Sequence, residues 1–359
     1  MDKSRILLIG TGRCGNKIVD EMLETDGRYT GLFINTTDVD LSDLENAKQR
    51  NTFIVPNASG TGKNRNTAKQ YVQEEDQKIL DRISKYTQQD TIICIASADG
   101  GSGSGITPLL INLINAIIEG KTINLVAVLP RYNEGKRALE NTIAFWNEVM
   151  KLYSRGIIKS IMLVDNNKRD TDTEINEKLI EDLDACLGAE GLTDETDSWV
   201  VNNDRGYKIV LNLEEGYDTV EEAIDACIAE SVFIYPEEAF KNCNSILGLL
   251  NPEAYDIESA KNQYSAKNFK KYGESEDYNT LILGGCRIPR EAIDVYVEQL
   301  EEIRNEEKNS ILKEEDLIVD VSPTVSVNIN DFVSKKVGSK KIKKKSLKEK
   351  LNDKSLWEI

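Results

Sequence analysis

The chain has 359 residues, of which 40% are hydrophobic and 30% are charged, as in ordinary globular proteins of one or two domains. It contains no histidine, which excludes Ser-His-Asp and Cys-His catalysis and any zinc site with histidine ligands. The net charge is −17, no apolar run reaches the roughly 18–20 residues of a membrane-spanning helix, and the first residues lack a signal-peptide pattern, so we expect a cytoplasmic protein without a membrane partner.

Apolar, strand-like runs alternate with amphipathic, helix-like segments through the first half of the chain. The expected strands are residues 5–9, 29–35, 52–55, 91–97, 124–129 and 160–164. The expected helices between them include residues 17–24, 68–86, 107–119 and 136–154. This alternation predicts an α/β fold in which a parallel sheet is covered by helices on both faces, as in Rossmann-like domains. The six cysteines form no CxxC pair and are expected to be small core residues.

The second half begins with an expected helix at residues 174–187, in which Ile175, Leu179, Leu183 and Leu187 form one apolar stripe. A smaller α+β domain is expected to follow, with strands at residues 207–213, 245–250 and 280–283 and helices at residues 219–229 and 290–304. We therefore divide the chain into a first domain (1–172), a central helix (173–191), a second domain (192–312) and a tail (313–359).

The first glycine-rich motif directly follows the first expected strand and opens a helix. It consists of Gly10, Thr11, Gly12, Arg13, Cys14, Gly15 and Asn16. Glycines let a backbone approach phosphate groups closely, and a helix N-terminus offers unpaired N–H groups with a positive dipole end. Taken alone, this motif fits NAD or FAD equally well, or a tight turn without a ligand.

A second glycine-rich motif follows the strand at residues 91–97. It consists of Asp99, Gly100, Gly101, Ser102, Gly103, Ser104 and Gly105. Successive backbone N–H groups in such a turn form an anion-binding concavity. Two such turns on one sheet predict a nucleotide whose phosphates are bound from both sides.

The second motif resembles the glycine-rich signature loop of the tubulin/FtsZ superfamily, with Asp99 at the position of its first glycine. The first motif resembles the first phosphate loop of that family, and residues 33–38 resemble the Asn-Thr-Asp end of its next strand. Pro130 followed by residues 134–137 (Glu-Gly-Lys-Arg) and the segment 164–167 (Val-Asp-Asn-Asn) also resemble family segments in the right order. The resemblance covers about residues 4–312 and is closest to the TubZ-type segregation tubulins of plasmids and phages.

This resemblance implies a GTP/GDP site, with Mg²⁺ bound through phosphates and water and no direct metal ligand from the chain. The implied nucleotide-binding residues outside the two glycine motifs are Asn35, Gly60, Thr61, Gly62, Pro130, Glu134, Arg137, Asn166, Asn176 and Glu177. Glu134 would bind the ribose, Asn166 the sugar or base, and either Asn176 or Glu177 the guanine. Residues 59–64 would face the γ-phosphate, although they lack the spacing of a P-loop.

Asp194 and Asp197 follow the central helix at the two acidic positions of the family's catalytic loop, whose asparagine is replaced here by Leu192. The resemblance implies that this loop reaches the nucleotide of the next subunit in a head-to-tail filament. Carboxylates there would polarise the attacking water. The alternative is an acidic helix start without a catalytic role.

The tail is basic, in contrast to the rest of the chain. Residues 331–359 carry a net charge of +6, which leaves −23 for the remainder. The lysines of interest are Lys335, Lys336, Lys340, Lys341, Lys343, Lys344, Lys345, Lys348 and Lys350. Such a stretch is expected to be disordered in isolation and to act as an interaction arm. In TubZ-type relatives the tail engages a DNA-binding adaptor on centromere DNA.

The sequence as a whole predicts a GTP-hydrolysing cytomotive filament protein that segregates plasmid or phage DNA in a bacterial host. A phage-particle-positioning or division tubulin is the alternative within the family. An NAD(P)-dependent Rossmann oxidoreductase and a non-enzymatic binding module are the alternatives outside it.

Overall fold

The computed structural model describes residues 2–192, 197, 200–201, 204–236 and 243–315. Ten strands of this part of the chain form a single sheet in the order β3-β2-β1-β4-β5-β6-β7-β10-β8-β9. The strands are β1 (Ile6–Thr11), β2 (Thr30–Asn35), β3 (Thr52–Ile54), β4 (Thr91–Ser97), β5 (Thr122–Leu129), β6 (Ile158–Asp165), β7 (Gly206–Asn212), β8 (Cys243–Leu250), β9 (Ala266–Glu274) and β10 (Thr280–Cys286). Neighbouring strands are parallel except that β10 runs antiparallel to both β7 and β8.

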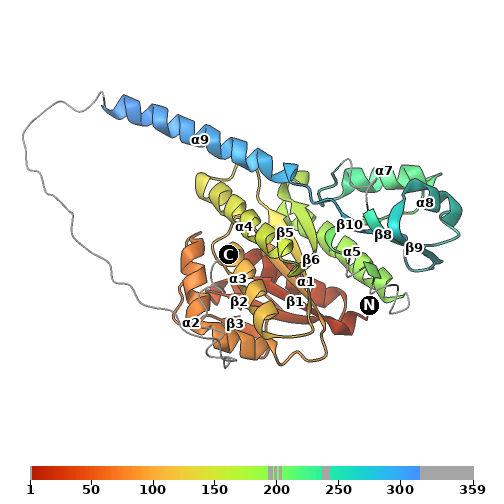
Figure 1. Ribbon diagram of the computed structural model, residues 1–359, viewed down its shortest axis with the longest axis horizontal. Coiled ribbons are helices and arrows are strands. Elements are labelled where there is room, and N and C mark those ends of the chain that lie inside the picture. Colours follow the sequence, from red (N-terminus) through yellow and green to blue (C-terminus); the bar gives the residue numbers. More distant parts are fainter. Residues whose placement is uncertain (1, 193–196, 198–199, 202–203, 237–242, 316–359) are drawn as a thin grey trace, which may run out of the picture.

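Helices pack on both faces of the sheet (Figure 1). They are α1 (Gly12–Thr25), α2 (Arg65–Ile83), α3 (Ser102–Ile117), α4 (Lys136–Ser154), α5 (Asp172–Gly191), α7 (Val220–Glu230), α8 (Ile257–Gln263) and α9 (Glu291–Glu315). Leu7 and Ile9 of β1 belong to the core beneath α2, α3 and α4, whereas Ile6 and Leu8 belong to the core beneath α1 and α5. Burial on both faces explains why these parallel strands are continuously apolar. No helix in the described ranges combines the length and the apolar character that a bilayer crossing requires.

The predicted α/β class and the alternation of strands and helices are confirmed. The apolar stripe of α5 is also confirmed, since Ile175, Leu179, Leu183 and Leu187 are all buried. The expected division into domains stays a prediction, because one continuous sheet runs through both halves of the chain.

Several element boundaries differ from the prediction. The helices α1 and α3 begin inside the two glycine motifs, at Gly12 and Ser102, because glycine and serine open a helix without a clash. Strand β9 and the short helix α8 were not predicted. Strand β9 lies at the edge of the sheet and has charged, exposed positions, so it lacks the apolar alternation that marks a buried strand. Helix α9 continues to residue 315, beyond the expected end at residue 304. Its distal turns extend away from the rest of the molecule, so an apolar stripe could not mark them in the sequence (Figure 1).

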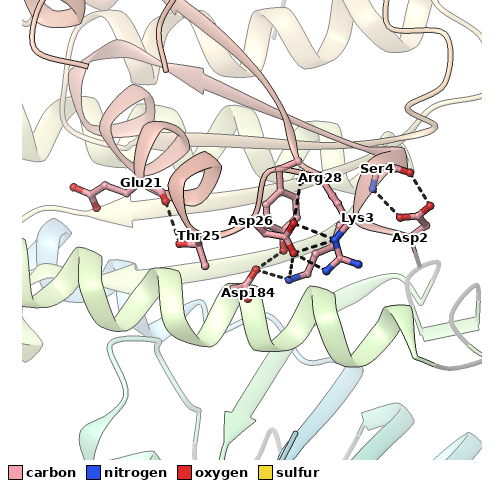
Figure 2. Close-up of polar contacts among 9 residues, drawn as sticks. Asp2, Lys3, Ser4, Glu21, Thr25, Asp26, Arg28 and Asp184 are labelled. Carbon is pink, nitrogen blue, oxygen red and sulfur yellow. Dashed lines mark hydrogen bonds and ion pairs between the residues drawn. The ribbon is translucent and has the colours of Figure 1, made fainter. Parts of the chain in front are cut away.

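The N-terminal turn is attached to α5 by a buried lysine (Figure 2). Lys3 is only 4% exposed, and its Nζ lies 2.7 Å from Asp184 Oδ1 on α5 and 3.1 Å from Asp26 Oδ2. The hydroxyl of Tyr29 donates to the same Asp184 oxygen at 2.8 Å, and its ring centre lies 5.1 Å from the ammonium. We call Lys3, Asp26, Tyr29 and Asp184 the Lys3 cluster; it connects the segments before and after α1 to the second half of α5.

Candidate nucleotide site

A polar cleft of about 750 Å³ lies at the carboxyl ends of the parallel strands β1, β4 and β5. This is the edge at which open α/β sheets bind ligands, and the volume is in the range of small-molecule sites. The cleft is lined by sixteen of the residues expected from the sequence: Thr11, Gly12, Arg13, Cys14, Gly60, Thr61, Gly62, Asp99, Gly100, Gly101, Ser102, Gly103, Pro130, Glu134, Asn166 and Asn176.

Both glycine motifs face this cleft and contact each other through glycines. Gly12 has a φ of +68°, and a Cβ atom on it would lie 2.8 Å from the backbone nitrogen of Gly103. A Cβ atom on Gly103 would in turn lie 2.9 Å from the carbonyl oxygen of Thr11. Helix α3 starts at Ser102 without a side-chain cap, so its first N–H groups are free to bind an anion in the cleft.

The other expected residues are not among those lining the cleft. They are Gly10, Gly15, Asn16, Asn35, Ser104, Gly105, Arg137 and Glu177. Several of them support the walls instead: the Asn16 amide donates to the Ile34 carbonyl oxygen at 3.1 Å, Asn35 donates to Asp40 at 3.1 Å, and Arg137 donates to the Gly62 carbonyl oxygen at 3.1 Å.

The cleft also has lining residues that the sequence analysis did not assign individually to the nucleotide. They are Lys17, Thr36, Thr37, Asp40, Lys63, Ser97, Val128, Arg131 and Asp172, of which Thr36, Thr37 and Lys63 lie in segments that the family resemblance already covered. Thr36 and Thr37 follow the end of β2, and Ser97 is the last residue of β4. Position at the carboxyl end of a predicted parallel strand was the signal that could have identified these three.

Lys63 closes one side of the cleft by binding two carboxylates. Its Nζ lies 3.1 Å from Asp99 Oδ2 and 3.1 Å from Glu134 Oε2. Partial burial alone would lower the pKa of Lys63, but the bonds to Glu134 and Asp99 outweigh it and raise the pKa. The carboxylate expected to bind a ribose therefore already has a cationic partner, and a ligand that uses Glu134 must share or displace Lys63.

The first two turns of α5 also line the cleft, through Asp172 and Asn176. Thr171 and Glu174 make a reciprocal capping box, which fixes where the helix starts. The Arg131 guanidinium donates to the carbonyl oxygens of residues 169 and 170 at 2.9 and 2.8 Å and pairs with Asp172 at 3.2 Å. In these turns Asn176 is buried and lines the cleft, whereas its neighbour Glu177 is exposed.

The two expected catalytic carboxylates follow α5 in the sequence. Asp194 falls outside the described residues. Asp197 is described, and its Oδ2 lies 3.2 Å from Lys271 Nζ on β9. Asp197 is not one of the residues that line the cleft of its own chain.

Comparison with known proteins shows which family and which solved structures this chain is similar to. The family model "Tubulin/FtsZ family, GTPase domain" matches residues 5–169. The chain is 29% identical over 326 residues to the Tubulin-like protein TubZ of Clostridium botulinum C phage, with 89% of each chain covered. The solved structure of Clostridium botulinum phage c-st TubZ, truncated in its C-terminal tail, matches with a TM-score of 0.76 at 28% identity, over 85% of this chain and 99% of that chain. A GTPγS-form protofilament of TubZ from Bacillus thuringiensis serovar israelensis matches with a TM-score of 0.74 at 15% identity, over 89% and 96%, a likeness of fold.

Proposed function

We propose that the chain binds and hydrolyses GTP and assembles head to tail into filaments, because residues 5–169 match the GTPase-domain model of the Tubulin/FtsZ family and the fold is tubulin/FtsZ-like. The observation that carries the proposal is the pair of glycine turns that line one cleft, together with the uncapped N-terminus of α3 and the buried Asn176 of α5 in the same cleft. Phosphates would lie against Gly100–Gly103 and Gly12, and the base against α5.

Asn176 is the residue we assign to guanine, in preference to Glu177. Its amide oxygen can accept a hydrogen from the N1 or N2 group of guanine, which adenine does not offer at that edge. Calorimetry with GTP and ATP tests this on the parent chain and on Asn176→Ala, with Glu177→Ala as the matched control. We expect GTP to bind more tightly than ATP, a loss of about tenfold for Asn176→Ala, equivalent to about 1.4 kcal/mol, and little change for the control. Equal or tighter binding of ATP by the parent would contradict the proposal.

Mg²⁺ bound with the nucleotide would supply positive charge at the phosphates. Across the described part of the chain, no three Cys, Asp or Glu side chains are grouped to hold a metal ion by themselves. Asp99 and Glu134 of the cleft are already paired with Lys63. We therefore assign the coordination of the ion to phosphate oxygens and water.

Hydrolysis would need the next subunit, because Asp197 is not in the cleft of its own chain and one structural relative was solved as a protofilament. Asp194→Ala and Asp197→Ala should keep nucleotide affinity and lose most GTP turnover, so that filaments persist. The measurement is phosphate release and pelleting over a protein concentration series. Parent turnover per molecule should rise with concentration. Wild-type turnover in both variants, or a rate per molecule that is independent of concentration, would contradict a site shared between subunits.

The finer role is DNA segregation through the basic tail. Residues 331–359 carry a net charge of +6, whereas the remaining chain carries −23. Because DNA is negatively charged, the tail is the part of the chain that would contact DNA or a DNA-bound adaptor. Truncation after Asn330 should preserve polymerisation and abolish co-sedimentation with an adaptor–centromere complex. Recruitment of the parent should weaken steeply with salt, by up to roughly one log unit per log unit of salt for each phosphate neutralised. Equal recruitment of both chains at every salt concentration would contradict this role.

A further inference from the structure

A buried polar cluster lies directly behind the second glycine motif, outside the cleft. It consists of Arg65 and Lys69 on α2, Ser104 on α3 and Glu148 on α4, and we call it the Arg65 cluster. Arg65 is 7% exposed, Glu148 is 8% exposed and Ser104 is fully buried. Charged side chains are rarely buried to this extent unless they have a specific task or a partner.

The Arg65 guanidinium binds both the side chain and the backbone of Ser104. Its Nε donates to the Ser104 hydroxyl oxygen at 3.0 Å, and its Nη2 donates to the Ser104 carbonyl oxygen at 2.8 Å. The Ser104 hydroxyl donates in turn to the carbonyl oxygen of Gly100. One arginine thus connects to both ends of the turn that surrounds Gly103.

Pro108 explains why the Ser104 carbonyl group needs an external donor. In an α-helix this oxygen would accept a hydrogen bond from the N–H group four residues later, and proline at position 108 has none. A buried carbonyl oxygen without a hydrogen-bond partner destabilises the fold, because it has lost its bonds to water. Arg65 supplies the missing donor, so the first turn of α3 takes its geometry from a side chain of α2.

Glu148 keeps the arginine in place. Its Oε2 lies 2.6 Å from Arg65 Nη2, and its Oε1 lies 2.6 Å from Lys69 Nζ. Helices α2 and α3 also touch at Gly105, where a Cβ atom would lie 2.9 Å from Ala68 Cβ. The turn therefore cannot move without moving α2 or breaking the bonds of Arg65.

We propose that Arg65 is a positioning residue for nucleotide binding, acting through Ser104 and the carbonyl group that Pro108 leaves without a helical donor. It aims the N–H groups of Ser102 and Gly103 into the cleft without touching the ligand. The inference rests on the proposed nucleotide site. The competing explanation is that the cluster only stabilises the packing of α2, α3 and α4.

Arg65→Lys separates these explanations, because lysine keeps the charge beside Glu148 but lacks the planar fork in which separate nitrogens donate to the Ser104 hydroxyl and carbonyl oxygens. Affinity is measured as GDP binding by calorimetry, on nucleotide-free protein below the concentration at which it assembles. We expect Arg65→Lys to melt close to the parent and to bind GDP at least about tenfold more weakly, which corresponds to about 1.4 kcal/mol. The double variant Arg65→Met with Glu148→Met, which leaves no unpaired buried carboxylate, should behave likewise.

Lys69→Met is the matched control. It removes the positive charge that pairs with Glu148 but leaves both hydrogen bonds to Ser104 in place. We expect it to bind GDP within about twofold of the parent. Pro108→Ala added to Arg65→Lys restores the helical N–H donor and should recover several-fold of the lost affinity. The proposal is overturned if Arg65→Lys binds GDP like the parent, if Lys69→Met is equally impaired, or if Pro108→Ala recovers nothing. Failure of the parent itself to bind GDP would instead refute the proposed function.

Discussion

Two buried cations lie at opposite ends of the parallel strands. Lys3 precedes β1 at the amino end of the sheet. Its partners Asp26, Asp184 and Tyr29 all contact it through their side chains. Arg65 lies at the carboxyl end. Two of its N–H groups donate to the carbonyl and hydroxyl oxygens of Ser104, beside the cleft. The comparison suggests that a cation whose partners are all side chains stabilises the fold, whereas one that also binds the backbone can shape a binding surface.

Replacing Lys3 should give the largest loss of stability without a loss of affinity. Lys3→Met leaves Asp26 and Asp184 without their shared cation, which costs roughly 3–5 kcal/mol of unfolding free energy for a buried pair. We expect the low end, since the two carboxylates keep some contact with water. Denaturant unfolding and GDP calorimetry check this, with Arg28→Met as control, because Arg28 also pairs with Asp26 but is 62% exposed. A Lys3→Met protein that is stable but binds GDP poorly would break the comparison.

Replacing Gly103 should chiefly reduce GDP affinity and not stability. The Cβ atom of Gly103→Val would lie 2.9 Å from the Thr11 carbonyl oxygen and push the two glycine turns apart. We expect this displacement of the phosphate-binding turns to reduce GDP affinity by about 100-fold, which corresponds to about 3 kcal/mol of binding free energy. Gly27→Val is the control, since nothing lies within 4 Å of the added Cβ atom. Unchanged affinity in Gly103→Val would show that phosphates do not use this turn.

Asp182 sharpens the comparison, because it is buried on the same helix as Asp184. Burial raises its pKa to about 6, and Lys178 at 3.0 Å offsets this only in part. Between about pH 4 and 6 the folded state thus keeps a proton that the unfolded state releases. In this range the group makes the free energy of unfolding fall as pH rises, and above pH 6 the whole destabilisation is present. Asp182→Asn should remove that slope and gain roughly 1–3 kcal/mol at pH 7. Denaturant unfolding of both proteins from pH 4 to 7 checks this, and parallel curves would contradict it.

The smallest effect is expected at the start of α5. Thr171→Ala removes the capping box and should cost about 1 kcal/mol of stability. Because Asn176 follows within two turns, GDP affinity should also fall by about two- to threefold. Thr219→Ala removes an equivalent N-cap from α7, away from the cleft, and should cost the same stability with no change in affinity. Equal affinity in both variants would show that the cap does not set the position of Asn176.

The parts of the structure that the sequence predicted depend on local patterns. Buried parallel strands are apolar throughout, and glycine turns follow their carboxyl ends, so the sheet and the position of the cleft could be predicted. The partners within the site depend on distant residues. Lys63 meets carboxylates 36 and 71 positions away, and Arg65 meets Glu148 83 positions away. Asn176 and Glu177 are adjacent, and only the packing of α5 decides that the first faces the cleft.

The two outer strands of the described sheet bear on the proposed assembly of this chain. One edge is β3, a strand of only three residues, and the other is β9, with the exposed lysines Lys267, Lys270 and Lys271. Short strands and edge lysines discourage sideways strand addition between molecules. For the proposed head-to-tail assembly, these edges therefore disfavour lateral association of copies through strand pairing.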